Sequence, residues 1–138
     1  MAKTVTDIFK ETARLKTREE RIAHLQANDS RIMKTILRMN FDKSIKCLIP
    51  EGTPPYTSAE KPKTDLATAH DANFRFFFRN KWSKGINQVE RERKFIRLLE
   101  DVTPAEAEML CKAKDREMKY IGITKKLCQD AFPGLIVE

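Results

Sequence analysis

The sequence predicts an all-α protein, a single compact domain of six or seven short helices with a Pro-rich ordered crossover. Three observations support this fold class. Glycine is scarce, with four residues in 138, whereas the helix-favouring Lys, Arg, Glu and Leu are abundant. Apolar residues recur at the spacing of helix faces, and Ser or Thr stands where several of these stretches begin. Hydrophobic residues make up 41% of the chain, enough for one core, so we expect residues 1–138 to form one domain.

The first two helices are predicted from their capping residues. Thr4 or Thr6 can cap a helix near residues 5–15. Residues 17–20, Thr-Arg-Glu-Glu, fit a capping box, in which the Thr hydroxyl accepts from the amide of the last Glu while that carboxylate reaches back to the Thr amide. The second helix should therefore begin there and end around Asn28.

A third helix and a connector follow. The helix should open at Asp29 or Ser30, both favourable N-cap residues, and four prolines in residues 42–64 then forbid a continuous helix. The apolar stripe of the helix consists of Ile32, Met33, Ile36, Leu37 and Phe41. The apolar residues of the connector are Ile45, Leu48, Ile49 and Tyr56. We expect them to hold the connector against the core as an ordered crossover rather than a domain linker.

The second half returns to helical patterns. A helix is expected over residues 65–79, with a bulky apolar face of Phe74, Phe77 and Phe78, and a turn over residues 81–85.

Three more helices are expected over residues 86–99, 103–114 and 124–132. The first places five residues on one side: Val89, Glu92, Phe95, Ile96 and Leu99. The second begins with an N-cap Thr followed by Pro and, two positions later, Glu, and the third ends before the Pro-Gly pair at 133–134. Five residues from several helices should be buried in the core: Ile36, Leu37, Phe95, Leu110 and Leu127.

Several function classes are excluded by missing motifs. Cys47, Cys111 and Cys128 are isolated and His24 and His70 are far apart, so neither a disulfide scaffold nor a zinc site is expected. The sequence has no phosphate-cradling glycine loop, no nucleophile elbow and no metalloprotease motif. We therefore expect no catalytic residues, no cofactor and no metal, and thus no enzyme. The start lacks an apolar signal run and no stretch reaches membrane-spanning length, which predicts a cytoplasmic protein without a membrane partner.

The charge distribution favours a polyanionic partner. The chain has 27 basic and 20 acidic residues, a formal net charge of +7. Residues 1–49 hold eleven basic and six acidic side chains, whereas residues 84–138 hold eleven and ten. Lys and Arg release counterions when they neutralise phosphates, although a protein can also carry this charge without binding anything.

Arg31, Lys34 and Arg38 form the first candidate binding feature. Their spacing aligns them on the third helix, opposite its apolar stripe, as a row roughly 10 Å long at ~1.5 Å per residue. Such a row suits a phosphate backbone, but by itself an ordinary solvent-exposed face is the simpler explanation.

Lys119, Gly122, Thr124, Lys125 and Lys126 form the second candidate. A glycine permits close backbone approach, and Thr124 begins a helix whose free amides point outward. Lysines in the first turn oppose the helix dipole, and a bound anion would offset that penalty. This pattern is what a phosphate site would produce.

These residues carry a resemblance. Residues 121–127, Ile-Gly-Ile-Thr-Lys-Lys-Leu, and residues 131–138 resemble the end of the helical N-terminal DNA-binding domain of ATP-dependent DNA ligases of the T-even phage type. The upstream helices fall in the expected order. The chain is also similar to small uncharacterised proteins of tailed phages that carry a Leu-Ile-Pro-Glu-Gly-x-Pro-Pro-Tyr segment, here residues 48–56. The Pro-rich connector departs from the ligase pattern.

The resemblance implies that Gly122, Thr124, Lys125 and Lys126 approach the DNA backbone in the minor groove. Ligases of this type continue into a nucleotidyltransferase domain with a Lys-x-Asp-Gly motif, which is missing from this sequence. The resemblance therefore implies DNA binding without the chemistry.

We therefore expect a stand-alone, non-catalytic module that binds duplex DNA through its phosphate backbone with little sequence specificity. It would be a phage replication, repair or transcription accessory in the host bacterial cytoplasm. The alternative is an adaptor on the same scaffold that binds a replisome or host protein, such as a sliding clamp or polymerase. Pro54, Pro55 and Tyr56 would suit such a partner, since a stiff proline stretch loses little entropy on docking.

Overall fold

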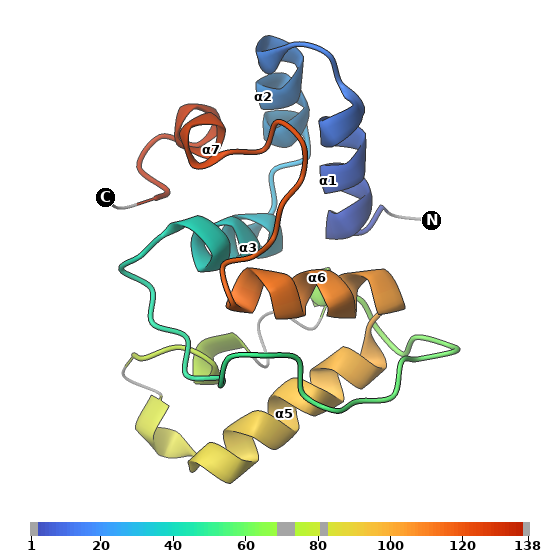
Figure 1. The fold of residues 1–138 in the computed structure, drawn as a ribbon, viewed down its shortest axis with the longest axis vertical. Coiled ribbons are helices and arrows are strands. Elements are labelled where there is room, and N and C mark those ends of the chain that lie inside the picture. Colours follow the sequence, from blue (N-terminus) through green and yellow to red (C-terminus); the bar gives the residue numbers. More distant parts are fainter. Residues whose placement is uncertain (1–2, 69–73, 81–82, 137–138) are drawn as a thin grey trace.

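The structure, a computed structural model, describes residues 3–68, 74–80 and 83–136 (Figure 1). These residues contain six complete α-helices, two 3₁₀ helices and two isolated β-bridges, with no strand. The predicted all-α class and the single compact domain are confirmed. The helices are α1 (Val5–Arg14), α2 (Arg18–Ala27), α3 (Arg31–Phe41), η1 (Phe74–Phe76), η2 (Ser83–Gly85), α5 (Gln88–Asp101), α6 (Pro104–Lys114) and α7 (Lys125–Ala131). Within the described part of the chain, no helix is long and apolar enough to cross a membrane.

Helix α6 is the centre of the arrangement. It packs against α1, α3 and α5, while α2 packs against α1 and α7. Figure 1 shows α1, α2 and α7 at one end of the molecule and α5 at the other, with α3 and α6 between them. The two ends are therefore joined through α6.

The predicted caps begin most of these helices. The N-cap side chain accepts from a backbone amide three residues later at each of Thr4, Thr17, Ser30, Asn87, Thr103 and Thr124. The capping box predicted at residues 17–20 is only half formed. The Thr17 hydroxyl accepts from the Glu20 amide at 3.1 Å, but the Glu20 carboxylate accepts from that hydroxyl rather than from the Thr17 amide. Full capping boxes occur at α1 and α6.

The helix predicted over residues 65–79 is wrong in its second half. Residues 66–68 are helical, residues 69–73 lie outside the described ranges, and η1 is a single 3₁₀ turn. Phe78 then forms a bridge with Cys47, in which the Leu48 amide donates to the Phe77 carbonyl at 2.7 Å. The backbone here bonds the connector instead of continuing a helix. The following turn is η2, and residues 81–82 of the predicted turn are not described.

Helix α5 exposes one residue that was expected on its apolar side. The helix begins after Asn87 and not at Ile86. Its buried residues are Arg91, Phe95, Leu98 and Leu99. Val89 is 58% exposed. The buried face of α5 is therefore rotated about the helix axis relative to the face that was predicted. The cause is Arg91, whose buried guanidinium bonds the Phe76 and Ser83 carbonyls and turns this side of α5 toward η1 and η2.

The connector is ordered, as predicted. The Lys114 side chain is fully buried, and its ammonium donates to the carbonyls of Pro50 at 2.8 Å and Gly52 at 3.0 Å and to the Asp115 carboxylate. The second Asp115 oxygen accepts from the Gly52 amide at 2.9 Å. Farther along, the buried Glu106 carboxylate accepts from the Leu66 amide at 3.0 Å. Side chains of α6 thus satisfy backbone groups that an extended segment cannot pair by itself.

The predicted core positions are confirmed. Ile36, Leu37, Phe95, Leu110 and Leu127 are each at most 2% exposed. We expect Ile36→Ala and Leu127→Ala each to lower the free energy of unfolding by about 2–5 kcal/mol, because each leaves a cavity. Urea denaturation would measure the change, with the exposed Val89→Ala as a control expected to stay within about 0.5 kcal/mol. Unchanged unfolding midpoints for both core variants would contradict the assigned core.

The three cysteines are free thiols, with Cys111 and Cys128 buried. Burial raises the pKa of the Cys128 thiol to about 12. Since the thiolate is the reactive form, Cys128 should stay unlabelled by iodoacetamide at pH 8 in the native protein and become labelled in urea. Peptide mass spectrometry would follow the label. Rapid labelling of Cys128 without denaturant would contradict this burial.

Candidate nucleic-acid interface

The second predicted feature contains a tight turn. The Ile123 amide donates to the Tyr120 carbonyl at 3.0 Å, which places Ile121 and Gly122 at the two corner positions. Gly122 has φ +78°, a conformation that favours glycine at the second corner of such a turn. The backbone conformation of the turn therefore accounts for a glycine at this position.

Two anchors fix the chain that enters the turn. The buried Asn40 amide bonds both backbone groups of Met118, donating to its carbonyl and accepting from its amide at 3.0 Å each. The Tyr120 ring then packs on the Phe9 ring, with centroids 5.4 Å apart. Helices α3 and α1 thereby position the turn.

The close neighbour of Gly122 is Arg21 of α2. A Cβ added at Gly122 would lie 2.4 Å from Arg21 Cζ. We expected this glycine to let a phosphate approach the backbone, but a guanidinium occupies that position. Arg21 is therefore a cation of this surface that sequence reasoning missed, and no local pattern links it to Gly122.

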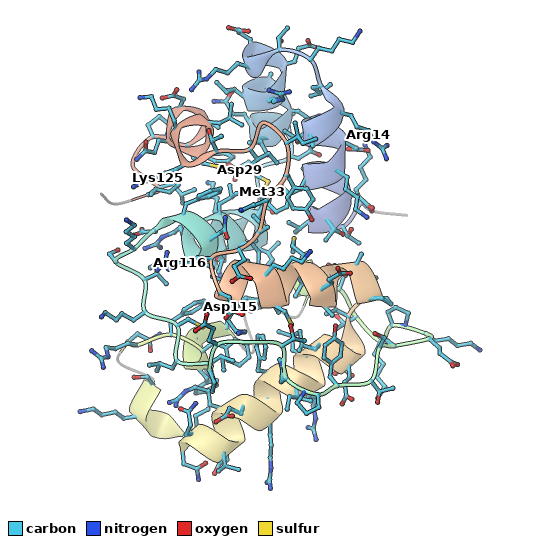
Figure 2. All side chains as sticks on the ribbon, viewed as in Figure 1. Arg14, Asp29, Met33, Asp115, Arg116 and Lys125 are labelled. Carbon is cyan, nitrogen blue, oxygen red and sulfur yellow. The ribbon has the colours of Figure 1, made fainter. Side chains whose placement is uncertain are left out.

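The start of α7 is capped as predicted. Thr124 Oγ1 accepts from the Leu127 amide at 3.1 Å, so one helix amide is already satisfied. Lys125 is half-buried and Lys126 exposed. Figure 2 shows Lys125 at the periphery beside α7, whereas Met33 of α3 lies near the centre of the molecule.

An acidic residue reduces the positive charge of this end. Lys126 Nζ lies 3.8 Å from Asp130, and Arg18 of α2 forms an ion pair with the same carboxylate. The Arg18 hydrogen bond, with Lys126 close by, lowers the pKa of Asp130. Lys126 therefore presents less net charge than the sequence alone indicates, and the i,i+4 spacing to Asp130 was the signal for it.

The row on α3 is also partly neutralised. Arg31 is exposed. Lys34 pairs with Asp29 at 3.0 Å, and Arg38 Nε lies 3.7 Å from the buried carboxylate of Asp42. Lys34 additionally lies 5.3 Å above the ring of Phe132, the C-cap of α7, so this end of α3 is beside α7. The row exists, but Lys34 and Arg38 have acidic partners.

A basic groove not predicted from the sequence lies between α1 and α6. It has a volume of about 250 Å³, and Lys10 of α1, Lys112 of α6 and Lys119 line it. Glu108 is the one carboxylate among its lining residues, 3.7 Å from Lys112. Lys119 joins the groove to the tight turn. No signal in the sequence could bring Lys10 to Lys112, because only the packing of α1 against α6 does so.

The residues proposed for a protein partner do not form one exposed surface. Pro54 and Pro55 line a separate groove of about 220 Å³ between the connector and α5, together with Glu51 and Glu92. Tyr56 is half-buried against the core, and burial raises its pKa. Pro54 is likewise half-buried, and Pro55 is exposed.

These features define an all-α domain with a basic groove that continues into a lysine-flanked turn. The chain belongs to a family of unknown function (DUF6433), whose model matches residues 8–120. No curated protein matches the chain. The matched segment includes all three lysines of the groove and ends at Tyr120, directly before the corner of the turn.

The cap at Thr124 supports both the turn and α7. We expect Thr124→Ala to lower the free energy of unfolding by about 1 kcal/mol, because the Leu127 amide loses its acceptor. Thr124→Ser keeps the hydroxyl and should restore most of that loss. Thermal or urea denaturation monitored by circular dichroism measures both, and equal stabilities of the alanine and serine variants would contradict the cap.

Proposed function

We propose that this protein is a non-catalytic module that binds duplex DNA through its phosphates. The observation that supports the proposal best is the basic groove, which is lined by Lys10 of α1, Lys112 of α6 and Lys119 of the following loop, with Glu108 as the one carboxylate in its lining. Bringing cations together is electrostatically unfavourable, and the packing of α1 against α6 maintains the arrangement. A polyanion relieves the repulsion and releases its own counterions.

The turn extends this surface. Lys119 belongs to the groove and precedes the turn, while Lys125 and Lys126 follow it, so a phosphate backbone has cations on both sides of the corner. Contacts to phosphate carry no base information, and little sequence preference is expected. The α3 row contributes less, since Lys34 and Arg38 have acidic partners.

The resemblance to the helical domain of DNA ligases supports the same function. It is carried by Gly122, Thr124, Lys125 and Lys126, which the structure places in a glycine turn and at a helix cap. An accessory role in phage replication, repair or transcription is part of the proposal and is supported by the resemblance alone.

The groove beside Pro54 and Pro55 favours a second candidate function, protein binding. The residues that line it are mostly apolar and include Glu51 and Glu92 but no Lys or Arg. The charge of this groove is therefore opposite in sign to the net charge of the chain. A partner segment with apolar and basic side chains would be complementary to it. If the protein does not bind duplex DNA, the function of a protein-binding adaptor replaces that of a DNA-binding module.

Fluorescence anisotropy with a labelled duplex tests the proposal. We expect the affinity of the wild type to fall with salt, with a log–log slope of about −0.9 per phosphate neutralised. The double variants Lys10→Glu/Lys112→Glu and Lys125→Glu/Lys126→Glu should each bind at least about tenfold more weakly and show a shallower slope, because they reverse charge on the proposed path.

The matched control is Arg93→Glu/Arg97→Glu. These two exposed arginines lie on α5, at the far end of the molecule from α1, α2 and α7 (Figure 1), and their pocket includes the carboxylates of Glu90 and Asp101. This variant changes the net charge equally and should retain most of the affinity. Equal weakening by all three variants would indicate a general charge effect, and absence of binding at low salt would exclude the function.

A further inference from the structure

Ile121 is the most exposed large hydrophobic residue of the described chain. Its exposed fraction is 79%, and the other exposed large hydrophobic is Val89 at 58%. Single apolar residues on a surface are common, so exposure alone indicates nothing. The position of Ile121 is different, since it occupies the first corner of the tight turn between Tyr120 and Ile123.

The turn holds Ile121 on a rigid base. On one side the Tyr120 ring packs on Phe9, and on the other Ile123 is only 5% exposed. The Arg21 guanidinium lies against Gly122 at the second corner. Both flanking side chains are thus held by the core while the isoleucine projects outward, an arrangement that costs little ordering entropy when a partner binds.

Cations precede and follow Ile121 in the chain. Lys119 lies two residues before it, Lys125 and Lys126 follow it at the start of α7, and the Arg21 guanidinium lies against the adjacent Gly122. A partner of Ile121 must therefore offer an apolar contact next to negative charge. Stacked base pairs between two phosphate backbones have both, and proteins that insert Ile, Leu, Met or Phe between base pairs unstack and bend the duplex.

We propose that Ile121 is a wedge that enters between adjacent base pairs of duplex DNA while the flanking lysines contact the phosphates on either side. The proposal rests on the proposed DNA binding and adds a deformation that phosphate contacts alone do not require. Pyrimidine–purine steps unstack most easily, so the protein should prefer duplexes that contain them even though no base edge is recognised.

The test uses a duplex with 2-aminopurine at a central TA step and a dye at each end. Binding of the wild type should raise the 2-aminopurine fluorescence, as the base unstacks, and increase energy transfer, as the ends approach each other. Ile121→Ser should lose both signals while binding weakens by about tenfold at most, since the lost contact is partly offset by the avoided cost of unstacking. Ile121→Leu should retain both signals.

Val89→Ser is the matched control, because it removes the other exposed large hydrophobic side chain. It should behave as the wild type in every signal. If the wild type binds without unstacking the duplex, or if Ile121→Ser unstacks it equally, the wedge is wrong while DNA binding stands. If the wild type does not bind duplex DNA at all, both proposals fail together.

Discussion

The rest of the structure depends on the hydrogen bonds that the buried ammonium of Lys114 donates. Removing an ammonium from water costs several kcal/mol unless its donors are satisfied, and three acceptors surround this one: the carbonyls of Pro50 and Gly52 and the carboxylate of Asp115. The same contacts give the connector its course across α6. Because α6 also packs against α1, α3 and α5, these contacts help to fix the position of Lys112, two residues earlier on the same helix. One lysine of the basic groove thus lies on a helix whose position depends on a buried cation.

Much of the fold could be predicted because its determinants are local. The cap at Thr103 lies within one turn of the helix that it begins, and the core residues of α3 repeat at helical spacing. The failures involve distant partners. Phe78 pairs with Cys47, and the side chain of Arg91 fixes the orientation of α5 by bonding the Phe76 carbonyl. Local periodicity carries no information about such contacts, so the helix over residues 74–79 and the placement of Val89 on the apolar side of α5 were predicted wrongly.

In the candidate site, too, features with local sequence signals could be predicted, whereas contacts between distant residues could not. The helix start at Thr124 was predicted because threonine has a strong local preference for the N-cap position. The pairing of Arg38 with Asp42 was visible too, at i,i+4 spacing, but formal charge counting overlooked it. The contact of Arg21 with Gly122, and the groove that Lys10 and Lys112 both line, could not be predicted, because they form only when segments far apart in the sequence pack together.

The hydrogen bonds between residues far apart in the sequence also have a consequence for how the chain folds. Pro50 and Lys114 are 64 residues apart, and Asn40 and Met118 are 78 apart. The entropy of closing such loops must be lost before the contacts form, which slows folding relative to helical proteins with local contacts. On the ribosome, α1 and α3 would emerge well before α6, which packs against both, and α2 would emerge well before α7, which packs against it. The three N-terminal helices therefore keep their apolar faces exposed until α6 and α7 have been synthesised. Completion of the fold depends on the last quarter of the chain.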